Sequence, residues 1–549
     1  MKTYRSLLIL ILIASFGFSS LKSFAGEKFS EHLKNETNKY CSHTELLESL
    51  PTLSGGRLKP LLSLSQETFQ FLTGKTKLGV LTSSVEFCLL SFSFFDENIK
   101  KVFLENNLVM ATIEHVQTKN FLKMAEGQKT ISLFDLLAKK DEIDLEFKSQ
   151  MENTSYRKDL IKLVRKISLF EELISGSLWS IFSPLKVGGE GLGKQKWKVQ
   201  DFIPLAILLE QKTAVAFSSD IWFKTLSDAK SDFISGNKEE PFLLELKYLK
   251  WHLFDWALLF SLITLMIWGI SKNYFYLYSA SSIIIIIQIA AITLRVIISG
   301  RAPITNMYET VTFSGVGAHL IGLFLSYRLK ERKFLLASLI YNFLALMMIR
   351  FANNMLDSSI APLVPVLRDN FWLSTHVTTV ILSYAALAVS WILCNIYFFK
   401  VIFKKVTDVQ EQKKYVTLSY TFVKIGVVLL AAGVILGGIW ADYSWGRFWG
   451  WDPKETWSLI ALLIYMAVLH GRHTQWLNSN RFLVMVSLSF LSIMMAWFGV
   501  NYILASGLHS YGFSEGGFYF LMSFFVIQIF IVVIYQIFNH RQNLKSSVA

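Results

Sequence analysis

Long stretches of uncharged apolar residues fill the second half of this chain, and they constrain its fold more than any other feature. From Trp251 onward such runs occur at about 253–270, 275–298, 310–327, 334–350, 376–400, 418–440, 456–470, 482–505 and 516–538. Roughly 20 helical residues cross a hydrocarbon core about 30 Å thick, so most of these runs can span a bilayer. The sequence therefore predicts an all-α polytopic membrane protein, with about eight or nine transmembrane helices in its C-terminal half.

The first 25 residues have the features of a secretory signal peptide or a signal anchor. Lys2 and Arg5 precede an apolar run, and Ser23-Phe24-Ala25 offers a small-x-small cleavage site. Either form would place residues 26–250 outside the cytoplasm, as a domain long enough to bury a core and mostly helical. We therefore expect three parts, at 1–25, 26–250 and 251–549.

Basic residues are concentrated in alternate loops of the second half. The loops 328–333, 400–414 and 471–481 and the C-terminal tail carry dense Lys and Arg, whereas the loops between them are rich in Gly, Pro and aromatic residues. If residues 26–250 lie outside, all the basic loops fall inside, as the positive-inside rule requires. The net charge of +13 then reflects membrane topology and contact with lipid, and we expect no nucleic acid partner. The C-terminus is predicted to be cytoplasmic.

Five tryptophans lie close together in the segment 440–457, on the predicted outer side. They are Trp440, Trp445, Trp449, Trp451 and Trp457. An interfacial aromatic belt also places tryptophans at helix ends, but a belt spreads them over many helices. In the same segment Asp452-Pro453-Lys454-Glu455 predicts a helix start, with an N-cap, a first-turn proline and a capping carboxylate. An aromatic loop at the start of a membrane helix favours a binding site for a planar ligand.

Two histidines are predicted on the same side as the tryptophans. His376 begins one apolar run, and His509 lies in the short loop before the last run. Two imidazoles beside an aromatic surface would suit haem iron, which takes axial nitrogen ligands while its macrocycle packs on aromatic rings. A lone interfacial histidine is more often a hydrogen-bonded structural residue, and spacing alone does not show that these two meet.

Other charged and polar residues suggest further contacts. His470 lies roughly 25 Å along the helix that starts at Pro453. An ionisable residue in the membrane is a functional candidate. The alternative is a structural histidine anchored at the inner membrane interface. His319 has small neighbours that indicate tight helix packing, and it ranks lower. Arg301 could pair with ligand carboxylates or simply belong to a capped turn.

Cysteine usage excludes several kinds of protein. Cys41, Cys88 and Cys394 form no CxxC pair, which argues against a thiol-disulfide oxidoreductase, a cysteine zinc site or a c-type haem attached to this chain. Cys41 and Cys88 could pair in an oxidising compartment, and the sequence leaves that pairing open. No side chain has the pattern of a catalytic nucleophile.

The four membrane-domain motifs resemble those of a known family. WGRFWGWDPKETWSLIALLIYMAVLH resembles the WWD motif of haem-handling proteins, and SGRAPITNMYETV, WLSTHVTTVILSYAALA and GLHSYGF resemble the segments that accompany it in the CcsA (ResC) family. That family is a component of the System II cytochrome c synthase. The resemblance covers about residues 245–538. GRLKPLLSLSQETFQFLTGK, from Gly56, is similar to an N-terminal segment of longer family members.

The resemblance implies a site and a reaction. Haem b would be both bound ligand and substrate, with His376 and His509 as axial iron ligands on the outer face and His470 as the ligand of an inward site. The family transports reduced haem to the outer face, where its vinyl groups form thioether bonds with an apocytochrome c CxxCH motif. Cofactor contacts are expected from Trp445, Trp449, Trp451, Asp452, Trp457 and Arg301.

The resemblance also implies partners and a location. We expect the bacterial inner membrane, an apocytochrome c substrate and a thioredoxin-like reductant of apocytochrome. The second membrane histidine of fused family members has no counterpart here, so a separate CcsB (ResB)-like subunit is expected, with His252 or His319 as poorer substitutes. Two alternatives are a haem-delivery WWD protein of another maturation pathway, and a transporter or scaffold that binds no haem.

Overall fold

The computed structural model describes residues 40–79, 81–93, 96–113, 115–150, 155–182, 202–204, 219–236, 241–352, 355–360, 369–404, 408–504 and 517–548. The chain divides into two compact units, Met1–Leu249 and Lys250–Ala549. The expected signal segment, residues 1–25, and the candidate ligand His509 lie outside the described residues.

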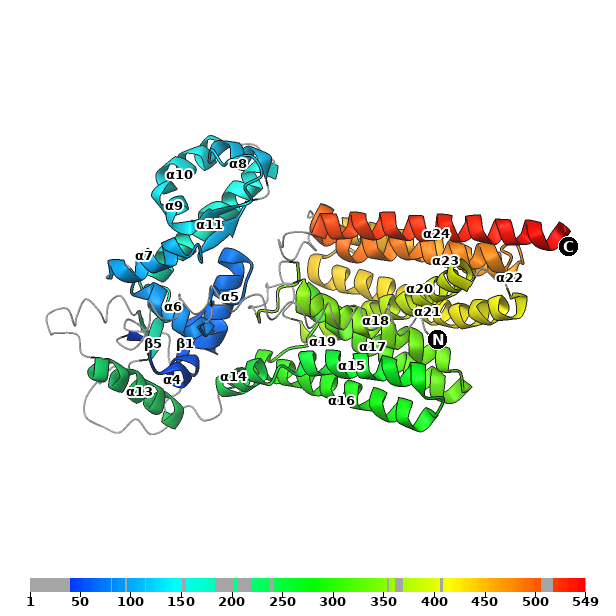
Figure 1. The fold of residues 1–549 in the computed structure, drawn as a ribbon, viewed down its shortest axis with the longest axis horizontal. Coiled ribbons are helices and arrows are strands. Elements are labelled where there is room, and N and C mark those ends of the chain that lie inside the picture. Colours follow the sequence, from blue (N-terminus) through cyan, green and yellow to red (C-terminus); the bar gives the residue numbers. More distant parts are fainter. Residues whose placement is uncertain are drawn as a thin grey trace. The chain divides into compact units, whose positions relative to one another are not determined.

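The first unit is mostly helical, as the sequence predicts (Figure 1). Its described helices are α4 (Thr44–Glu48), α5 (Leu61–Thr73), α6 (Ser83–Ser91), α7 (Glu97–Glu105), α8 (Val116–Phe121), α9 (Leu133–Ala138), α10 (Lys140–Ser149), α11 (Ser155–Ile174), α13 (Ser219–Gly236) and α14 (Phe242–Trp251). Short antiparallel pairs of strands accompany them: β1 (Pro51–Ser54) with β2 (Arg57–Pro60), β3 (Met110–Thr112) with β4 (Thr130–Ser132), and β5 (Ser180–Phe182) with β6 (Phe202–Pro204). The β1–β2 turn needs positive φ at both central residues, and Gly55 and Gly56 provide it.

A disulfide joins Cys41 to Cys88 in the core of the first unit. Their Cα atoms are 6.1 Å apart, and both side chains are buried beside Phe87 and Leu89 of α6. The bond closes a loop of 47 residues in sequence, which corresponds to about 4 kcal/mol of lost loop entropy in the unfolded chain. The pairing that the sequence leaves open is therefore formed.

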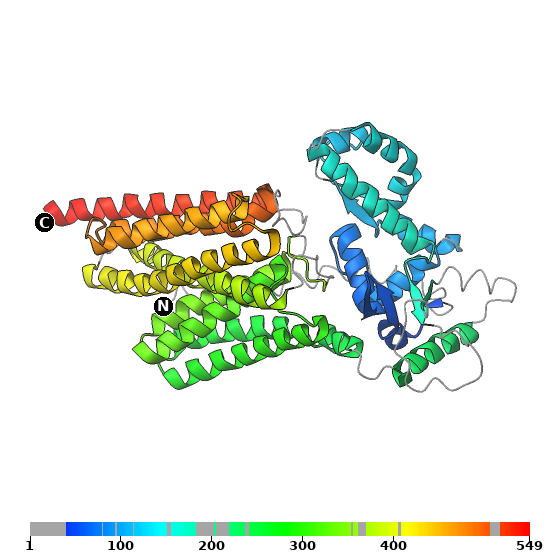
Figure 2. The same cartoon turned by 180° about the vertical axis from the view of Figure 1, so that it is seen from behind.

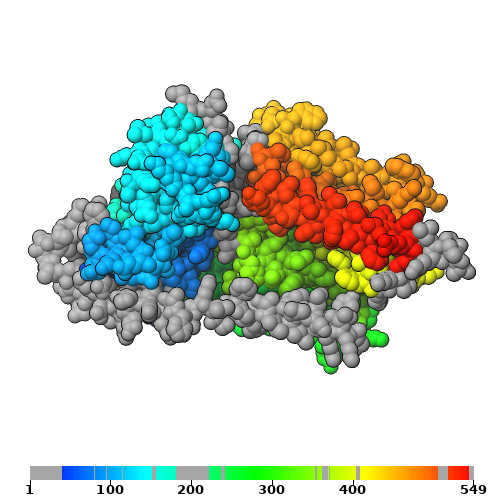
Figure 3. Space-filling model, turned by 45° about the horizontal axis from the view of Figure 1, so that its top comes forward, coloured from blue at the N-terminus to red at the C-terminus, as the bar shows by residue number. Residues whose placement is uncertain are grey.

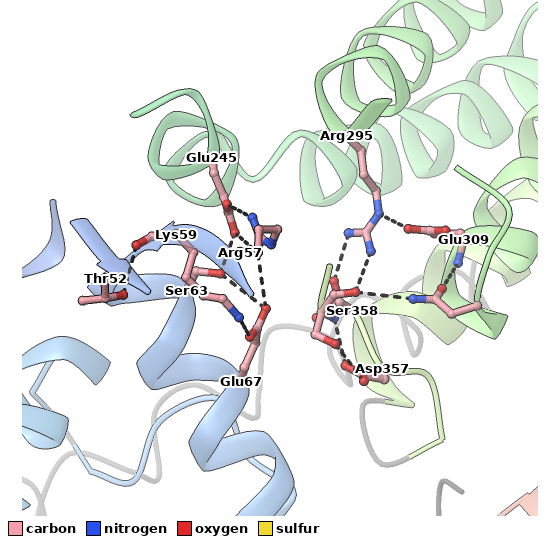
Figure 4. A network of polar contacts seen from close by, with 12 residues as sticks. Thr52, Arg57, Lys59, Ser63, Glu67, Glu245, Arg295, Glu309, Asp357 and Ser358 are labelled. Carbon is pink, nitrogen blue, oxygen red and sulfur yellow. Dashed lines mark hydrogen bonds and ion pairs between the residues drawn. The ribbon is translucent and has the colours of Figure 1, made fainter. Parts of the chain in front are cut away.

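A buried ion-pair network joins α14 to the β1–β2 hairpin within the first unit (Figure 4). Arg57 Nη2 donates to Glu245 Oε1 at 3.0 Å, and Ser63 Oγ donates to the same oxygen at 2.6 Å. Lys59 Nζ donates to Glu67 Oε2 at 2.5 Å. Because Glu245 is only 2% exposed, these donors compensate a carboxylate that would otherwise be costly to bury.

The second unit is a bundle of long helices (Figure 1, Figure 2). They are α15 (Leu253–Ile270), α16 (Tyr274–Ser299), α17 (Met307–Leu329), α18 (Arg332–Phe351), α19 (Asn370–Trp372), the π-helical turn η3 (Leu373–Val377), α20 (Thr378–Lys404), α21 (Val409–Trp445), α22 (Pro453–His473), α23 (Ser479–Met494), the π-helical segment η4 (Met495–Leu504) and α24 (Gly517–Val548).

Eight helices in the described residues are long and apolar enough to cross a membrane. They cover Phe242–Ile270, Tyr274–Ser299, Met307–Leu329, Arg332–Phe351, Leu373–Phe403, Val409–Trp445, Ser479–Leu504 and Gly517–Gln542. The ninth predicted run forms α22, which is less apolar than these eight and packs against α21, α23 and η4. The predicted fold class, an all-α polytopic membrane protein with about eight or nine such helices, is confirmed.

Two sets of loops mark opposite ends of this bundle. We call the end with residues 300–306 and 446–452 the loop end, and the end with residues 328–333, 400–404 and 408–414 the basic end. At the basic end Lys333 lies 3.6 Å from Glu411, which also pairs with Lys400.

Small residues let the helices of the second unit approach closely. A Cβ on Gly322 of α17 would lie 2.0 Å from Ser338 Oγ of α18, and a Cβ on Gly426 of α21 would lie 2.5 Å from Leu387 Cγ of α20. Such contacts are typical of membrane helices, where close packing replaces the hydrophobic effect. Along α24, the red helix on one face of the unit in Figure 3, exposed apolar side chains such as Val526 and Phe530 suit contact with lipid.

Candidate functional site: an aromatic cavity at the loop end

Five segments that are distant in sequence surround one cavity at the loop end of the bundle. Its empty volume is about 1100 Å³ including the open mouth. The walls come from residues 304–310, from η3 and the start of α20, from residues 434–440 of α21, from residues 449–458, and from η4. An open concave site lined mainly by apolar and aromatic side chains, with a few polar groups, is typical of small-molecule binding sites.

His376 lies in the π-helical turn η3 and lines the cavity. Its Nδ1 is 2.9 Å from the carbonyl oxygen of Gly433 on α21. A carbonyl can only accept, so Nδ1 carries the hydrogen and Nε2 carries the lone pair. Histidines that bind metal ions commonly donate their other ring N–H to a carbonyl in this way, which fixes the tautomer and the ring orientation.

Gly437 provides the space that the His376 ring occupies. A Cβ at Gly437 would lie 2.6 Å from His376 Cε1 and 3.3 Å from Nε2. Any larger residue here would displace the imidazole. Two residues of α21 therefore position His376: the Gly433 carbonyl accepts its hydrogen bond, and Gly437, which has no side chain, leaves space for its ring.

Aromatic rings form much of the remaining wall. Trp440 lies beside His376, with ring centroids 5.7 Å apart, and is only 4% exposed. Tyr384 and Trp497 lie 5.6 Å apart, and Trp497 Nε1 donates to Thr310 Oγ1 at 3.2 Å. Both π-helical segments, η3 and η4, contribute side chains to the cavity, in keeping with the frequent use of π-helical turns at functional sites.

The helix start predicted after the tryptophan-rich loop is confirmed. The Asp452 carboxylate accepts from Lys454 N at 2.9 Å, Pro453 begins α22, and Glu455 accepts from Asp452 N at 3.2 Å, which completes a capping box. Asp452 is 6% exposed and does not line the cavity. Its contacts assign it to the helix cap.

Glu455 also holds the loop before α22. It accepts from Gly450 N at 2.8 Å, and Arg447 Nη1 lies 3.9 Å from its other oxygen. A Cβ on Gly450 would lie 1.0 Å from Arg447 Nη1, so the guanidinium takes its present position because Gly450 has no side chain. Arg447 also lies over the Trp445 ring, 5.9 Å from its centroid. The loop is therefore a packed structure that presents Trp449 to the cavity.

The structure separates the residues singled out from the sequence. His376 and Trp449 line the cavity, whereas Arg301 and the other loop residues proposed as cofactor contacts do not: Trp445, Trp451, Asp452 and Trp457. Trp451 is 71% exposed and meets Trp449 edge to face. The lining residues Tyr384, Lys454, Glu455 and Trp497 were not among the predicted cofactor contacts, and neither was Trp440. The sequence signal at Lys454 is its place in the first turn of α22, which identifies the helix start and not a cavity residue.

The remaining candidate histidines lie away from this cavity. His470 is exposed near the basic end of α22, seventeen residues after Pro453. His319 is fully buried, with Nδ1 3.4 Å from Asn342 Nδ2, and it lines no described cavity. A Cβ on Gly315 would lie 2.8 Å from Asn342 Oδ1, which confirms the tight packing predicted around His319. His252 is exposed and lies 3.5 Å from Asp255.

A buried ion pair fixes one wall of the cavity (Figure 4). Arg295 Nε donates to Glu309 Oε1 at 2.7 Å, and both side chains are at most 3% exposed. Arg295 also donates to the carbonyl oxygens of Ser358 and Ser359, each at 2.9 Å. Glu309 Oε2 accepts from Thr305 N at 2.8 Å, so the pair holds the segment whose residues 304–307 line the cavity.

The lining is consistent with a planar metal macrocycle. Among the described residues no group of three or more His, Cys, Asp and Glu side chains could hold a bare metal ion. A metal that arrives in a porphyrin needs only axial ligands from the protein, and the oriented His376 imidazole can be one of them. The aromatic side chains in the walls can pack against the faces of such a ring.

Fold and site together define a polytopic membrane protein with an aromatic, histidine-containing ligand cavity. Comparison with known proteins agrees. Residues 304–509 match the family model described as "Cytochrome C assembly protein", a range that includes all three candidate histidine ligands. Proteins named "Cytochrome c biogenesis protein CcsA" are also similar. The one from Guillardia theta is 32% identical over 267 residues, which are 44% of this chain and 87% of that protein.

Two further relatives carry the same name. The protein from Prochlorococcus marinus (strain NATL2A) is 34% identical over 250 residues, 39% of this chain and 78% of its own length. The one from Chlamydomonas reinhardtii is 35% identical over 227 residues, 39% of this chain and 62% of its own length. The chain belongs to the CcsA family of cytochrome c biogenesis proteins, and its role lies in haem handling during cytochrome c maturation.

Proposed function

We propose that this chain is the CcsA-like subunit of a System II cytochrome c synthase. It carries haem b to the outer face of the bacterial cytoplasmic membrane and holds it there while haem is attached to an apocytochrome c. The observation that carries the proposal is the oriented His376 in the aromatic cavity at the loop end. The loop end would face outward, because Lys and Arg are concentrated at the opposite, basic end.

The chain's own residues would bind and orient the substrate. His376 would supply one axial nitrogen to the haem iron, with His509 proposed as the opposite ligand. Trp440 and Trp449 would pack against the macrocycle and exclude water. Attachment adds each cysteine S–H of the apocytochrome CxxCH motif across a haem vinyl group, so no atom is lost and no enzyme nucleophile is needed. The contribution of the protein is proximity and orientation.

The proposal includes partners. His470 is exposed near the end of α22, which suits a haem ligand whose opposite partner comes from another chain, and we propose a CcsB-like subunit for that role. The apocytochrome cysteines must arrive reduced, which implies a thioredoxin-like reductant. We place residues 26–250 on the outer side, where an oxidising compartment favours the Cys41–Cys88 disulfide.

Reconstitution in a host that lacks its own cytochrome c synthase tests this function. The chain is expressed with a CcsB-like subunit and a reporter apocytochrome c, and covalent haem on the reporter is measured after denaturing electrophoresis. We expect assembly with the wild-type chain and a loss of about 100-fold or more with His376→Ala, because removing even an outer partner of a metal ligand costs 10- to 100-fold. The exposed His540, replaced by alanine, is the matched control and should leave assembly unchanged.

Two results would contradict the proposal. Normal haem attachment with His376→Ala would show that the cavity does not serve the reaction. Haem delivered to a separate haem-carrying protein, with no thioether on the reporter, would favour a haem-delivery protein of another pathway.

A further inference from the structure

We propose that Lys454 and Trp440 form a carboxylate-binding part of the loop-end cavity, which recognises the two propionate groups of haem and thereby fixes which edge of the macrocycle faces the mouth. This inference rests on the proposed function, since it concerns how the same cavity holds its substrate. It replaces Arg301, which the sequence suggested for carboxylates and which does not line the cavity.

Lys454 supplies the positive charge in the cavity wall. Among the described lining residues only Lys454 and Glu455 carry a full charge, and the remainder are apolar, aromatic or neutral polar side chains. An ammonium group in such surroundings is costly unless an anion compensates it. A ligand that enters with its own carboxylates provides that compensation.

The carboxylates of the chain near Lys454 are already engaged. Asp452 accepts from Lys454 N as the cap of α22. Glu455 accepts from Gly450 N and Asp452 N and faces Arg447. Within the described residues the Lys454 ammonium forms no direct ion pair, and Asp452 acts on its charge only through space. Its charge is therefore available to a ligand.

Trp440 supplies an independent second donor. Its side chain is 4% exposed and lines the cavity, and its Nε1–H has no hydrogen-bond acceptor in the described part of the chain. Buried indole N–H groups normally find an acceptor. A ligand carboxylate oxygen would satisfy this donor as well as the Lys454 charge.

Fixing the carboxylates orients the reactive groups. In haem the two propionates leave one edge of the macrocycle and the vinyl groups lie on other edges. His376 alone would allow the ring to rotate about the bond from the iron to the imidazole nitrogen. Anchoring the propionates removes that freedom and holds the vinyl groups in one position for the incoming thiols.

The test compares haem with its dimethyl ester, in which both carboxylates are neutral. The full-length chain in complex with its CcsB-like subunit is titrated with each compound, and the loop-end signal is the part of the haem absorbance that His376→Ala removes. The wild-type complex should bind the free acid about tenfold or more tightly than the ester, as expected for a charge-assisted hydrogen bond. Lys454→Gln should lose most of this preference and bind the ester as well as wild type does.

Matched variants complete the experiment. Lys454→Arg keeps the charge and should keep the preference, whereas Trp440→Phe keeps the ring, removes the N–H and should lose a smaller part of it. Arg301→Gln should match wild type. A Lys454→Gln complex that weakens acid and ester equally, or neither, overturns the inference while haem binding by His376 stands. A wild-type complex with no haem signal that depends on His376 overturns the proposed function, and the inference with it.

Discussion

The two ends of α22 differ in how much of a site this chain builds. At the loop end, residues from five segments enclose a cavity, and His376 is held by the Gly433 carbonyl and by the space at Gly437. At the basic end, His470 is exposed and no described cavity contains it. α22 thus begins at the loop-end cavity, which this chain forms by itself, and ends near His470, whose binding site would need a second molecule.

The two histidines differ in what fixes the position of the imidazole. At the loop end, helix packing determines the position of the imidazole, so the ligand meets a preformed geometry. At the basic end the orientation of His470 can be set only by what covers it. We infer that the loop end retains its binding properties in the isolated chain, while the basic end acquires them in the complex.

The largest expected effect comes from breaking the ion pair that supports the loop-end wall. Glu309→Ala would leave the buried Arg295 without its partner, which costs about 3–5 kcal/mol. The thermal midpoint of the chain in detergent, and haem binding at the loop end, should both fall. The control at the other end is Glu411→Ala, which removes a partly exposed carboxylate from ion pairs with Lys333 and Lys400. The loss of stability in Glu411→Ala should be about 1 kcal/mol or less. Equal losses in the two variants would contradict the proposed difference between the two ends.

Filling the space beside His376 should have the next largest effect. In Gly437→Val the new side chain would collide with the imidazole, because a Cβ alone lies 2.6 Å from Cε1. Overpacking of this kind costs about 1–3 kcal/mol, which predicts haem binding at the loop end weaker by roughly fivefold to 150-fold. Gly269→Val makes the same change where a Cβ meets nothing within 4 Å, and it should leave binding unchanged. The idea fails if the two variants bind haem equally well.

The sequence predicted much of this arrangement, and the misses have physical reasons. Apolar run lengths identified the helices, and Asp452-Pro453-Lys454-Glu455 identified the start of α22, because both signals are local. The cavity depends on contacts between distant segments: Trp497 and Tyr384 meet only after η4 packs beside α20. Likewise the sequence suggested Arg301 as the cation for ligand carboxylates, and only packing shows that Lys454 lines the cavity and Arg301 does not.

A smaller effect is expected from removing His470. In the complex with a CcsB-like subunit, His470→Ala should reduce bound haem by about half, because one of two proposed sites is lost while the loop end remains. In the chain purified alone the same variant should match wild type. Haem content, measured by pyridine haemochrome against protein concentration, checks both statements. A loss of haem in the isolated chain would show that the basic end binds haem without a partner.

Changes in the first unit should have the smallest effect on haem binding at either end of α22. The stability of this unit itself should depend on pH. Burial raises the pKa of Glu86 from its ordinary 4.5 to about 7, although Leu78 N and Gly79 N donate to its carboxylate. The folded unit then binds more protons than the unfolded chain between these values. Stability is greatest below about pH 4.5 and falls as pH rises toward 7, by at most about 3 kcal/mol.

Thermal unfolding of the full chain between pH 5 and pH 8 measures this dependence. Glu86→Gln should flatten it, while haem binding at both ends of α22 stays as in wild type. A change of the haem signal with Glu86→Gln would mean that the two units are coupled through this site.

The most direct measurement is the absorbance spectrum of ferrous haem bound to the isolated chain, purified without a CcsB-like subunit, in wild type, His376→Ala and His470→Ala. We expect a six-coordinate low-spin spectrum in wild type that His376→Ala removes and His470→Ala leaves intact. Retention of that spectrum in His376→Ala, with its loss in His470→Ala, would contradict the claim that this chain alone builds the loop-end site.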